Sequence, residues 1–149
     1  MKIFVGSDHA GFKLKQKLLQ DLREEYQIVD CGSFNEDSVD YPDIVAKVTQ
    51  AVLLEEALGI LICGTGVGMS ITANKIAGIR AALCQDPLTA RLAREHNNAN
   101  ILTLGARIIG PYLAQEITRS FINSSFAGGR HQMRLEKIEQ IEKYTRRNS

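Results

Sequence analysis

The sequence predicts an α/β fold in which helices cover both faces of a five-stranded parallel sheet. Short apolar runs rich in β-branched residues alternate with longer amphipathic segments about five times along the chain, and no proline-rich linker or internal repeat interrupts them. This alternation is typical of parallel sheets, because each strand needs a helical crossover to reach its parallel neighbour. The length of 149 residues suits one domain, which we place at 1–149.

Five short apolar runs are predicted strands, since such runs favour buried β structure. In chain order they are 3–5, 28–29, 58–62, 79–83 and 101–104. The third run is expected to be fully buried, and it leads directly into the glycine-rich segment 64–68.

Proline and capping residues place the starts of two helices. Pro42 suits the first turn of a helix that runs to about Glu56, with Asp40 as its cap. Asp86 is the expected N-cap of a later helix, and Pro87 is its first residue.

Apolar residues that recur at helical spacing predict the other helices and support the one that begins at Pro87. Those that share a face are Leu14, Leu18 and Leu22; Leu88 and Leu92; Leu113, Ile117 and Phe121; and Leu135, Ile138 and Ile141. A shorter helix follows the glycine-rich segment and ends at about Lys75. Gly128 and Gly129 break the chain before the last helix.

Composition excludes several kinds of partner. Lys and Arg total 18 against 17 Asp and Glu, a net charge of +1 that argues against nucleic acid binding. The longest apolar runs are far shorter than the ~20 residues of a membrane span. No basic and apolar leader opens the chain, so we expect a cytoplasmic protein. Three scattered cysteines predict neither a disulfide framework nor a zinc site.

Residues capable of chemistry follow the predicted strands, which is where open α/β sheets bind their ligands. They are Asp8, His9, Asp40, Tyr41, Cys63 with the glycines after it, Asp86 and Arg107. His96 and Asn97 are the exception, because they lie between a helix and the fifth strand. Their placement suits the site of a neighbouring subunit.

The segment 64–68 combines three alternating glycines with a cysteine directly before it. Its backbone N–H groups can face an anion at the start of a helix, although a simple strand-to-helix turn is the alternative. Met69 stands where a Walker A loop or a Cys-x5-Arg phosphatase loop needs another residue. Cys63 is a candidate nucleophile or base, because a thiol at a helix N-terminus has its pKa lowered below ~8.5. Cys31 and Cys84 are expected to be structural.

Two arginines near the C-terminus are candidates for phosphate binding. Arg130 and Arg134 share a helix face at spacing four, although a solvated face beside several glutamates is the alternative. We expect His131 to be exposed. Near the N-terminus, His9 can bind an anion while Asp8 meets hydroxyl groups.

Seven blocks, in order, resemble the type B ribose-5-phosphate isomerases, a family shared with isomerases of galactose 6-phosphate and allose 6-phosphate. They are 6–12 (GSDHAGF), 40–42 (DYP), 62–70 (ICGTGVGMS), 73–75 (ANK), 95–100 (EHNNAN), 104–107 (LGAR) and 128–132 (GGRHQ). The resemblance spans essentially the whole chain. It implies a Rossmann-like three-layer sandwich and a homodimer with sites at the subunit interface, sometimes paired into tetramers. It also implies a sugar phosphate substrate with no metal or organic cofactor.

The resemblance also implies a role for each candidate residue in moving a proton between C1 and C2 through an enediolate. Cys63 is the base, and His96 opens the sugar ring, with Thr65 and Asp8 near the hydroxyl groups. The backbone around Gly64, Gly66, Val67 and Gly68 stabilises the enediolate oxygen. The residues that hold the substrate are Tyr41 and Asn97 for the sugar, and His9, Arg107, Arg130 and Arg134 for the phosphate, some of them from the second subunit.

The expected reaction is the interconversion of ribose 5-phosphate and ribulose 5-phosphate. Some members of the family lack the cysteine and use a carboxylate base, so Cys63 places this chain in the cysteine branch. An isomerase of allose 6-phosphate or another hexose phosphate is the first alternative, since one extra carbon discriminates weakly. A sugar-phosphate-binding module without catalysis is the second.

Overall fold

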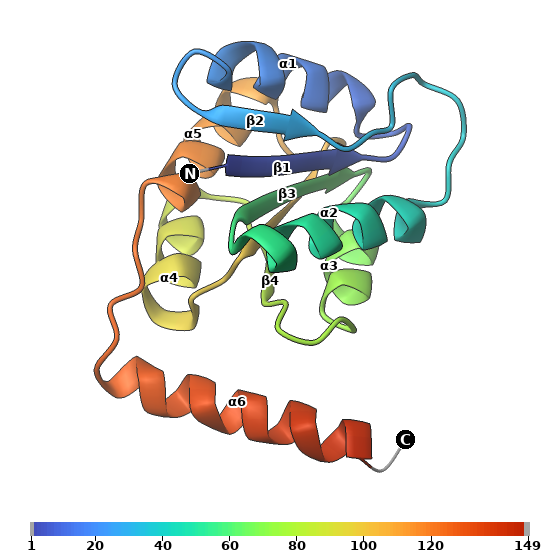
Figure 1. The fold of residues 1–149 in the computed structure, drawn as a ribbon. Helices are drawn as coiled ribbons and strands as arrows, with labels where there is room; N and C mark the ends of the chain where they lie inside the picture. Colours follow the sequence, from blue (N-terminus) through green and yellow to red (C-terminus); the bar gives the residue numbers. More distant parts are fainter. Residues whose placement is uncertain (1, 148–149) are drawn as a thin grey trace.

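The computed structural model describes residues 2–147, apart from the side chain of Arg146, and confirms the predicted α/β fold (Figure 1). Within those residues five strands form one parallel sheet in the spatial order β2-β1-β3-β5-β4. The strands are β1 (Lys2–Ser7), β2 (Gln27–Asp30), β3 (Leu58–Cys63), β4 (Ala81–Leu83) and β5 (Ile101–Gly105).

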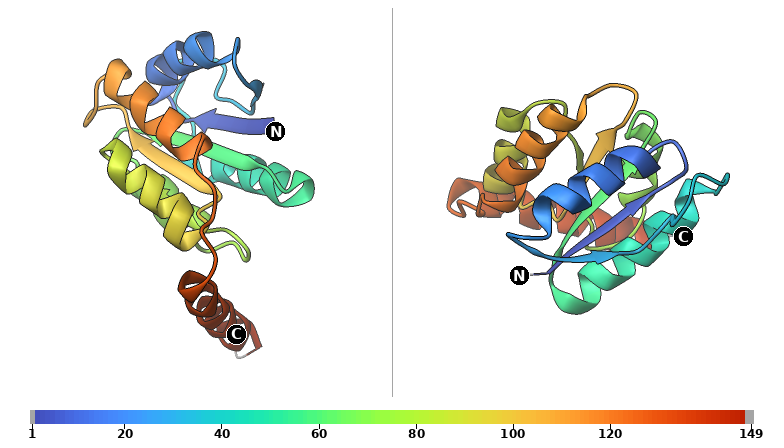
Figure 2. Two further views of the ribbon diagram at one scale, coloured as in Figure 1. Left: turned by 90° about the vertical axis from the view of Figure 1, so that its left-hand side faces the viewer. Right: turned by 90° about the horizontal axis from the view of Figure 1, so that it is seen from above.

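Helices pack on both faces of this sheet (Figure 2). One face carries α1 (Phe12–Leu22), α4 (Pro87–Asn97) and α5 (Pro111–Ile122). The other face carries α2 (Tyr41–Glu55) and α3 (Val67–Ala73). The last helix, α6 (Arg130–Arg147), follows an extended segment and stands apart from both faces (Figure 1).

The central strand β3 divides its side chains between the two cores, because alternate residues of a strand point to opposite faces. Ile60 and Ile62 pack under α1, α4 and α5. Leu61 and Cys63 pack under α2 and α3. Every residue of β3 is buried, as the sequence predicts.

The order of strands reverses between β1 and β3. The chain leaves β1 for β2 on one side and later returns to β3 on the other side. Ser7 is paired with Ile62, so the next residues, Asp8 and Cys63, lie beside each other at the carboxyl ends. Ligands of open α/β sheets bind at such a reversal.

Three details differ from the sequence predictions. β4 begins at Ala81 rather than 79, because Gly78 (φ +76°) closes a turn in which the Ile79 N–H donates to the Ile76 carbonyl. α3 ends at Ala73, two residues early. Asp40 occupies the cap position of α2, but within residues 2–147 its side chain makes no capping hydrogen bond.

The capping prediction at α4 is confirmed. The Asp86 carboxylate accepts a hydrogen bond from the Thr89 N–H at 2.7 Å, and the Thr89 hydroxyl donates to the other carboxylate oxygen. These two bonds lower the pKa of Asp86, and Pro87 is the first residue of the helix.

Candidate active site

The sulfur of Cys63 lies at the end of β3, inside the turn that begins α3. The side chain is 5% exposed, and its Sγ accepts a hydrogen bond from the Gly66 N–H at 3.1 Å. A backbone N–H that points at sulfur stabilises negative charge there. This places a thiol with an electrostatic partner at the edge of the sheet where ligands bind.

The turn 64–66 needs a glycine at its third position. Gly66 has φ +78°, and a Cβ on it would come within 2.6 Å of Leu83 Cδ1 and 2.9 Å of the Leu104 carbonyl carbon. Thr65 is exposed, and its hydroxyl accepts from the Val67 N–H at 3.3 Å in the first turn of α3. Only glycine therefore fits the third position of the turn, and the backbone N–H groups of Gly66 and Val67 lie at the start of α3.

The chain after β5 is joined to the same loop by two backbone hydrogen bonds. The Ala106 N–H donates to the Cys63 carbonyl at 2.8 Å, and the Arg107 N–H donates to the Gly64 carbonyl at 2.9 Å. The Arg107 side chain covers Gly64, since a Cβ there would come within 3.4 Å of its Nη1. The structure therefore brings an exposed guanidinium next to the cysteine turn.

Residues after β1 and β2 complete this half of the site. Asp8 is 7% exposed, and its carboxylate accepts from the Gly11 N–H at 2.9 Å. His9 is exposed, and its Nδ1 accepts from the Val39 N–H at 3.4 Å. Tyr41 packs its ring on the glycine loop, because a Cβ on Gly68 would come within 2.8 Å of Tyr41 Cζ.

The remaining candidates lie at the opposite edge of the sheet. α4 runs from the carboxyl end of β4 back to the amino end of β5, so His96 and Asn97, in its last turn, lie at the amino edge. They belong to the helix itself rather than to the segment after it. The Ala127 N–H donates to the Glu95 carbonyl at 2.9 Å, and this contact carries the start of α6 to the same place.

The expectation that His131 is exposed is wrong. Its ring is half-buried and stacks on that of His96, with centroids 4.2 Å apart and planes 11° from parallel. Partial burial and the nearby charges of His96, Arg130 and Arg134 lower the pKa of His131. A cluster of imidazole and guanidinium groups thus lies at the amino edge, away from Cys63, and Arg130 and Arg134 are exposed in it.

Cys84 is buried in the core on the face of the sheet opposite to the core that holds Cys63, and no glycine-rich turn follows it, so a structural role remains the expectation. Burial, with a smaller effect from Asp86, raises the pKa of the Cys84 thiol to about 12, and burial is also the main cause of the raised pKa of Cys31.

We expect Cys84→Ala to flatten the loss of stability at alkaline pH. The native thiol titrates at about 12 against an ordinary value of 9.0. Its stabilising contribution is therefore complete below pH 9 and lost progressively up to about 12. Urea unfolding at one protein concentration should show the stability difference between the two proteins shrinking as pH rises. A constant difference would contradict this account.

Residues 2–147 contain neither a metal-binding cluster nor a membrane-spanning helix. No cluster of three or more His, Cys, Asp or Glu side chains is arranged to hold a metal ion among those residues. In the same range, no helix combines the length and the apolar character needed to cross a membrane.

Comparison with known proteins decides the family. The sequence profile of the family described as Ribose/Galactose Isomerase matches residues 3–138. The chain belongs to this family. An isomerase of the family from Escherichia coli strain K12, named ribose-5-phosphate isomerase B, is 46% identical over 149 residues, with 99% of each chain covered.

Solved structures of isomerases share the fold. A ribose-5-phosphate isomerase B from Clostridium thermocellum is 49% identical, with a TM-score of 0.95 and 97% of this chain and 99% of that chain covered. The Mycoplasma genitalium ribose-5-phosphate isomerase B, solved with bound ribulose-5-phosphate, is 42% identical, with a TM-score of 0.91 over 95% of this isomerase and 96% of its own chain.

Proposed function

We propose that this chain interconverts ribose 5-phosphate and ribulose 5-phosphate, a reaction of the pentose phosphate pathway. The observation that carries the proposal is the buried Cys63 sulfur, which accepts the Gly66 N–H inside a glycine turn at the strand reversal. The chain is 46% and 49% identical in sequence to two proteins named ribose-5-phosphate isomerase B, which supports the same proposal.

Cys63 acts as the base in the proposed mechanism. Its thiolate takes the proton from C2 of the open-chain aldose, and the C–H electrons form the C1–C2 double bond. Negative charge then develops on O1, where the N–H groups of residues 64–68 stabilise it as an oxyanion hole does. Return of the proton to C1 and transfer of the O2 proton to O1 complete the ketose.

The other roles divide between the two edges of the sheet. At the carboxyl edge, Asp8 and Thr65 contact sugar hydroxyls, Tyr41 positions the sugar, and His9 and Arg107 contact the phosphate. At the amino edge, His96 opens the ring by proton transfer at the ring oxygen, and Asn97 orients the sugar. The phosphate ligands from this edge are Arg130 and Arg134, whose planar guanidinium groups suit bidentate binding.

These two sets can meet only if the isomerase is a homodimer in which each site takes one edge from each copy. The apolar side chains that α6 exposes support this proposal. Leu135 is the only buried side chain among those described in α6, while Met133, Ile138 and Ile141 are 63%, 48% and 66% exposed. A groove of about 770 Å³ separates α6 from the edge of the sheet beside β4. A second copy would cover this apolar surface.

We propose that the reaction takes place in the cytoplasm, because the cysteines are free thiols rather than disulfides. Cys31, Cys63 and Cys84 are all free, and a base at Cys63 must stay reduced. Reducing compartments keep thiols in that state.

A coupled assay with ribose 5-phosphate and allose 6-phosphate side by side, in buffer containing EDTA, tests the substrate. We expect kcat/KM to favour ribose 5-phosphate by roughly tenfold or more, the range that one extra carbon in a pocket allows. The reverse preference would assign the enzyme to hexose phosphates. If neither sugar reacts and bound sugar exchanges no C2 proton with deuterated solvent, the chain is a binding module.

A further inference from the structure

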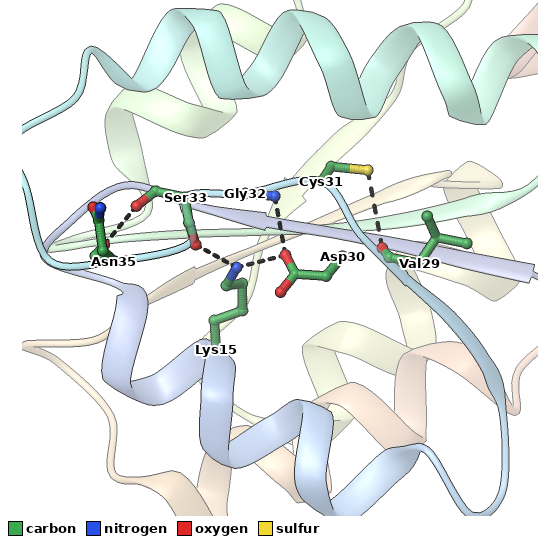
Figure 3. A network of polar contacts seen from close by, with 7 residues as sticks. All are labelled: Lys15, Val29, Asp30, Cys31, Gly32, Ser33 and Asn35. Carbon is green, nitrogen blue, oxygen red and sulfur yellow. Dashed lines mark hydrogen bonds and ion pairs between the residues drawn. The ribbon is translucent and has the colours of Figure 1, made fainter.

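Lys15 is the one lysine or arginine that is buried among the residues that the structure describes. It lies on α1 with 0% of its surface exposed. Its Nζ contacts Asp30 Oδ1 at 2.5 Å and donates to the Ser33 carbonyl at 2.6 Å (Figure 3). The rings of Phe12 and Phe34 flank the ammonium, with centroids 5.7 Å and 5.4 Å away.

Stability alone does not account for this arrangement. Removing an ammonium from water costs several kcal/mol, and a buried ion pair is often no more stabilising than apolar residues of the same volume. Asp30 is also shielded, at 15% exposed. A buried pair can instead hold one local geometry against alternatives.

The geometry that Lys15 holds is that of the loop after β2, residues 31–40. Asp30 Oδ1 also accepts from the Gly32 N–H at 2.9 Å, so one carboxylate joins α1 to the start of the loop. Ser7 and the loop exchange two backbone hydrogen bonds of 2.7 Å, to Gly32 O and from Ser33 N. Lys15 therefore fixes the loop beside Ser7, the last residue of β1, which directly precedes Asp8.

The far end of the same loop reaches the proposed site. The Val39 N–H donates to His9 Nδ1, which leaves Nε2 as the hydrogen-bearing nitrogen of the neutral ring. Two residues later, Tyr41 packs on Gly68. A displaced loop would move both the imidazole and the phenol ring.

We propose that Lys15 is a positioning residue of the isomerase: by holding the Ser33 carbonyl and Asp30, it sets the loop that orients His9 and Tyr41 toward the sugar phosphate. This rests on the proposed binding roles of His9 and Tyr41. The hydrogen bond to the sulfur of the base Cys63 comes from Gly66, which lies outside the loop, so the effect falls on substrate binding rather than on the chemical step.

The test is the double variant Lys15→Met with Asp30→Asn. It leaves no unpaired buried charge, and the asparagine oxygen can still accept from the Gly32 N–H. We expect KM for ribose 5-phosphate to rise roughly ten- to a hundredfold, the scale of one lost hydrogen bond to a charged group, while kcat changes little. Inhibition by inorganic phosphate should weaken in parallel.

Lys17→Met is the matched control, because Lys17 lies on the same helix but forms its ion pair with Asp21, at 3.1 Å on the surface. It should leave KM unchanged. A double variant with lower thermal stability but unaltered KM and phosphate inhibition would overturn the proposal. If the unaltered protein does not isomerise ribose 5-phosphate, the proposed function fails instead.

A variant on the loop side keeps the test decisive if the double variant does not fold. Phe34 is 73% exposed, so Phe34→Ala removes one ring from the ammonium with little risk to the core. We expect KM to rise roughly two- to fivefold, the scale of one exposed cation–π contact. No rise in KM would refute the positioning role.

Discussion

Replacing Cys63 with alanine will lower kcat by roughly a factor of 10² to 10⁴ and leave sugar phosphate binding intact, because a positioned base contributes about that much. The thiol is only 5% exposed, and the sugar and the phosphate are proposed to be held by other residues, so its removal should leave their contacts in place. Steady-state kinetics should therefore show the loss in kcat. Calorimetric titration with ribose 5-phosphate should show an unchanged Kd.

Cys84→Ala serves as the control, because it removes a buried thiol of the other core, away from the glycine turn. It should keep the wild-type kcat. Full turnover in Cys63→Ala would refute the assignment of the base, whereas a loss of kcat in both variants would indicate general damage to the fold.

A dimer that combines a Cys63→Ala chain with a His96→Gln chain should be active, although each parent homodimer keeps only a small residual activity. In such a dimer one site receives both defects and the other receives neither. Two copies tagged differently and co-expressed allow the mixed dimer to be purified. We expect roughly half of the wild-type activity per dimer, because one of two symmetric sites is intact.

The competing arrangement gives the opposite result. If Cys63 and His96 acted within one chain, each chain of the mixed dimer would carry one defect and no site would work. A mixed dimer as inactive as its parents would therefore overturn the shared site. Differently tagged copies of Cys63→Ala alone provide the background rate.

Much of the fold was predictable because local patterns determine it. The alternation of apolar runs and amphipathic segments locates the strands, and the proline after Asp86 marks the start of α4. The start of β4 was not predictable from the pattern, since Ile79 is apolar like a strand residue. Its place in a turn follows from the positive φ of Gly78, which apolar periodicity does not reveal.

The carboxyl-edge half of the candidate site was predictable from the sequence, whereas the amino-edge half was not. Asp8, Cys63 and Arg107 lie at or just beyond the carboxyl ends of parallel strands, so their proximity at one edge follows from topology. The stacking of His131 on His96 depends on the route of residues 123–129, which carries no periodic signal.

The burial of Lys15 could have been suspected from its position in the sequence, although the sequence analysis did not single it out. It lies three and four residues before Leu18 and Leu19, on the buried face of α1. A lysine on such a face needs a partner, but local spacing cannot name Asp30.

The separation of α6 from the sheet makes catalysis depend on mass action. Helices in proteins owe most of their stability to tertiary packing, and among the side chains described in α6 Leu135 alone is buried against its own chain. A chain diluted below the dissociation constant of the proposed dimer would therefore lose both the second edge of the site and the order of the helix that carries the arginines. Specific activity should therefore decrease as the enzyme is diluted, and the helical circular dichroism signal per residue should decrease over the same concentration range.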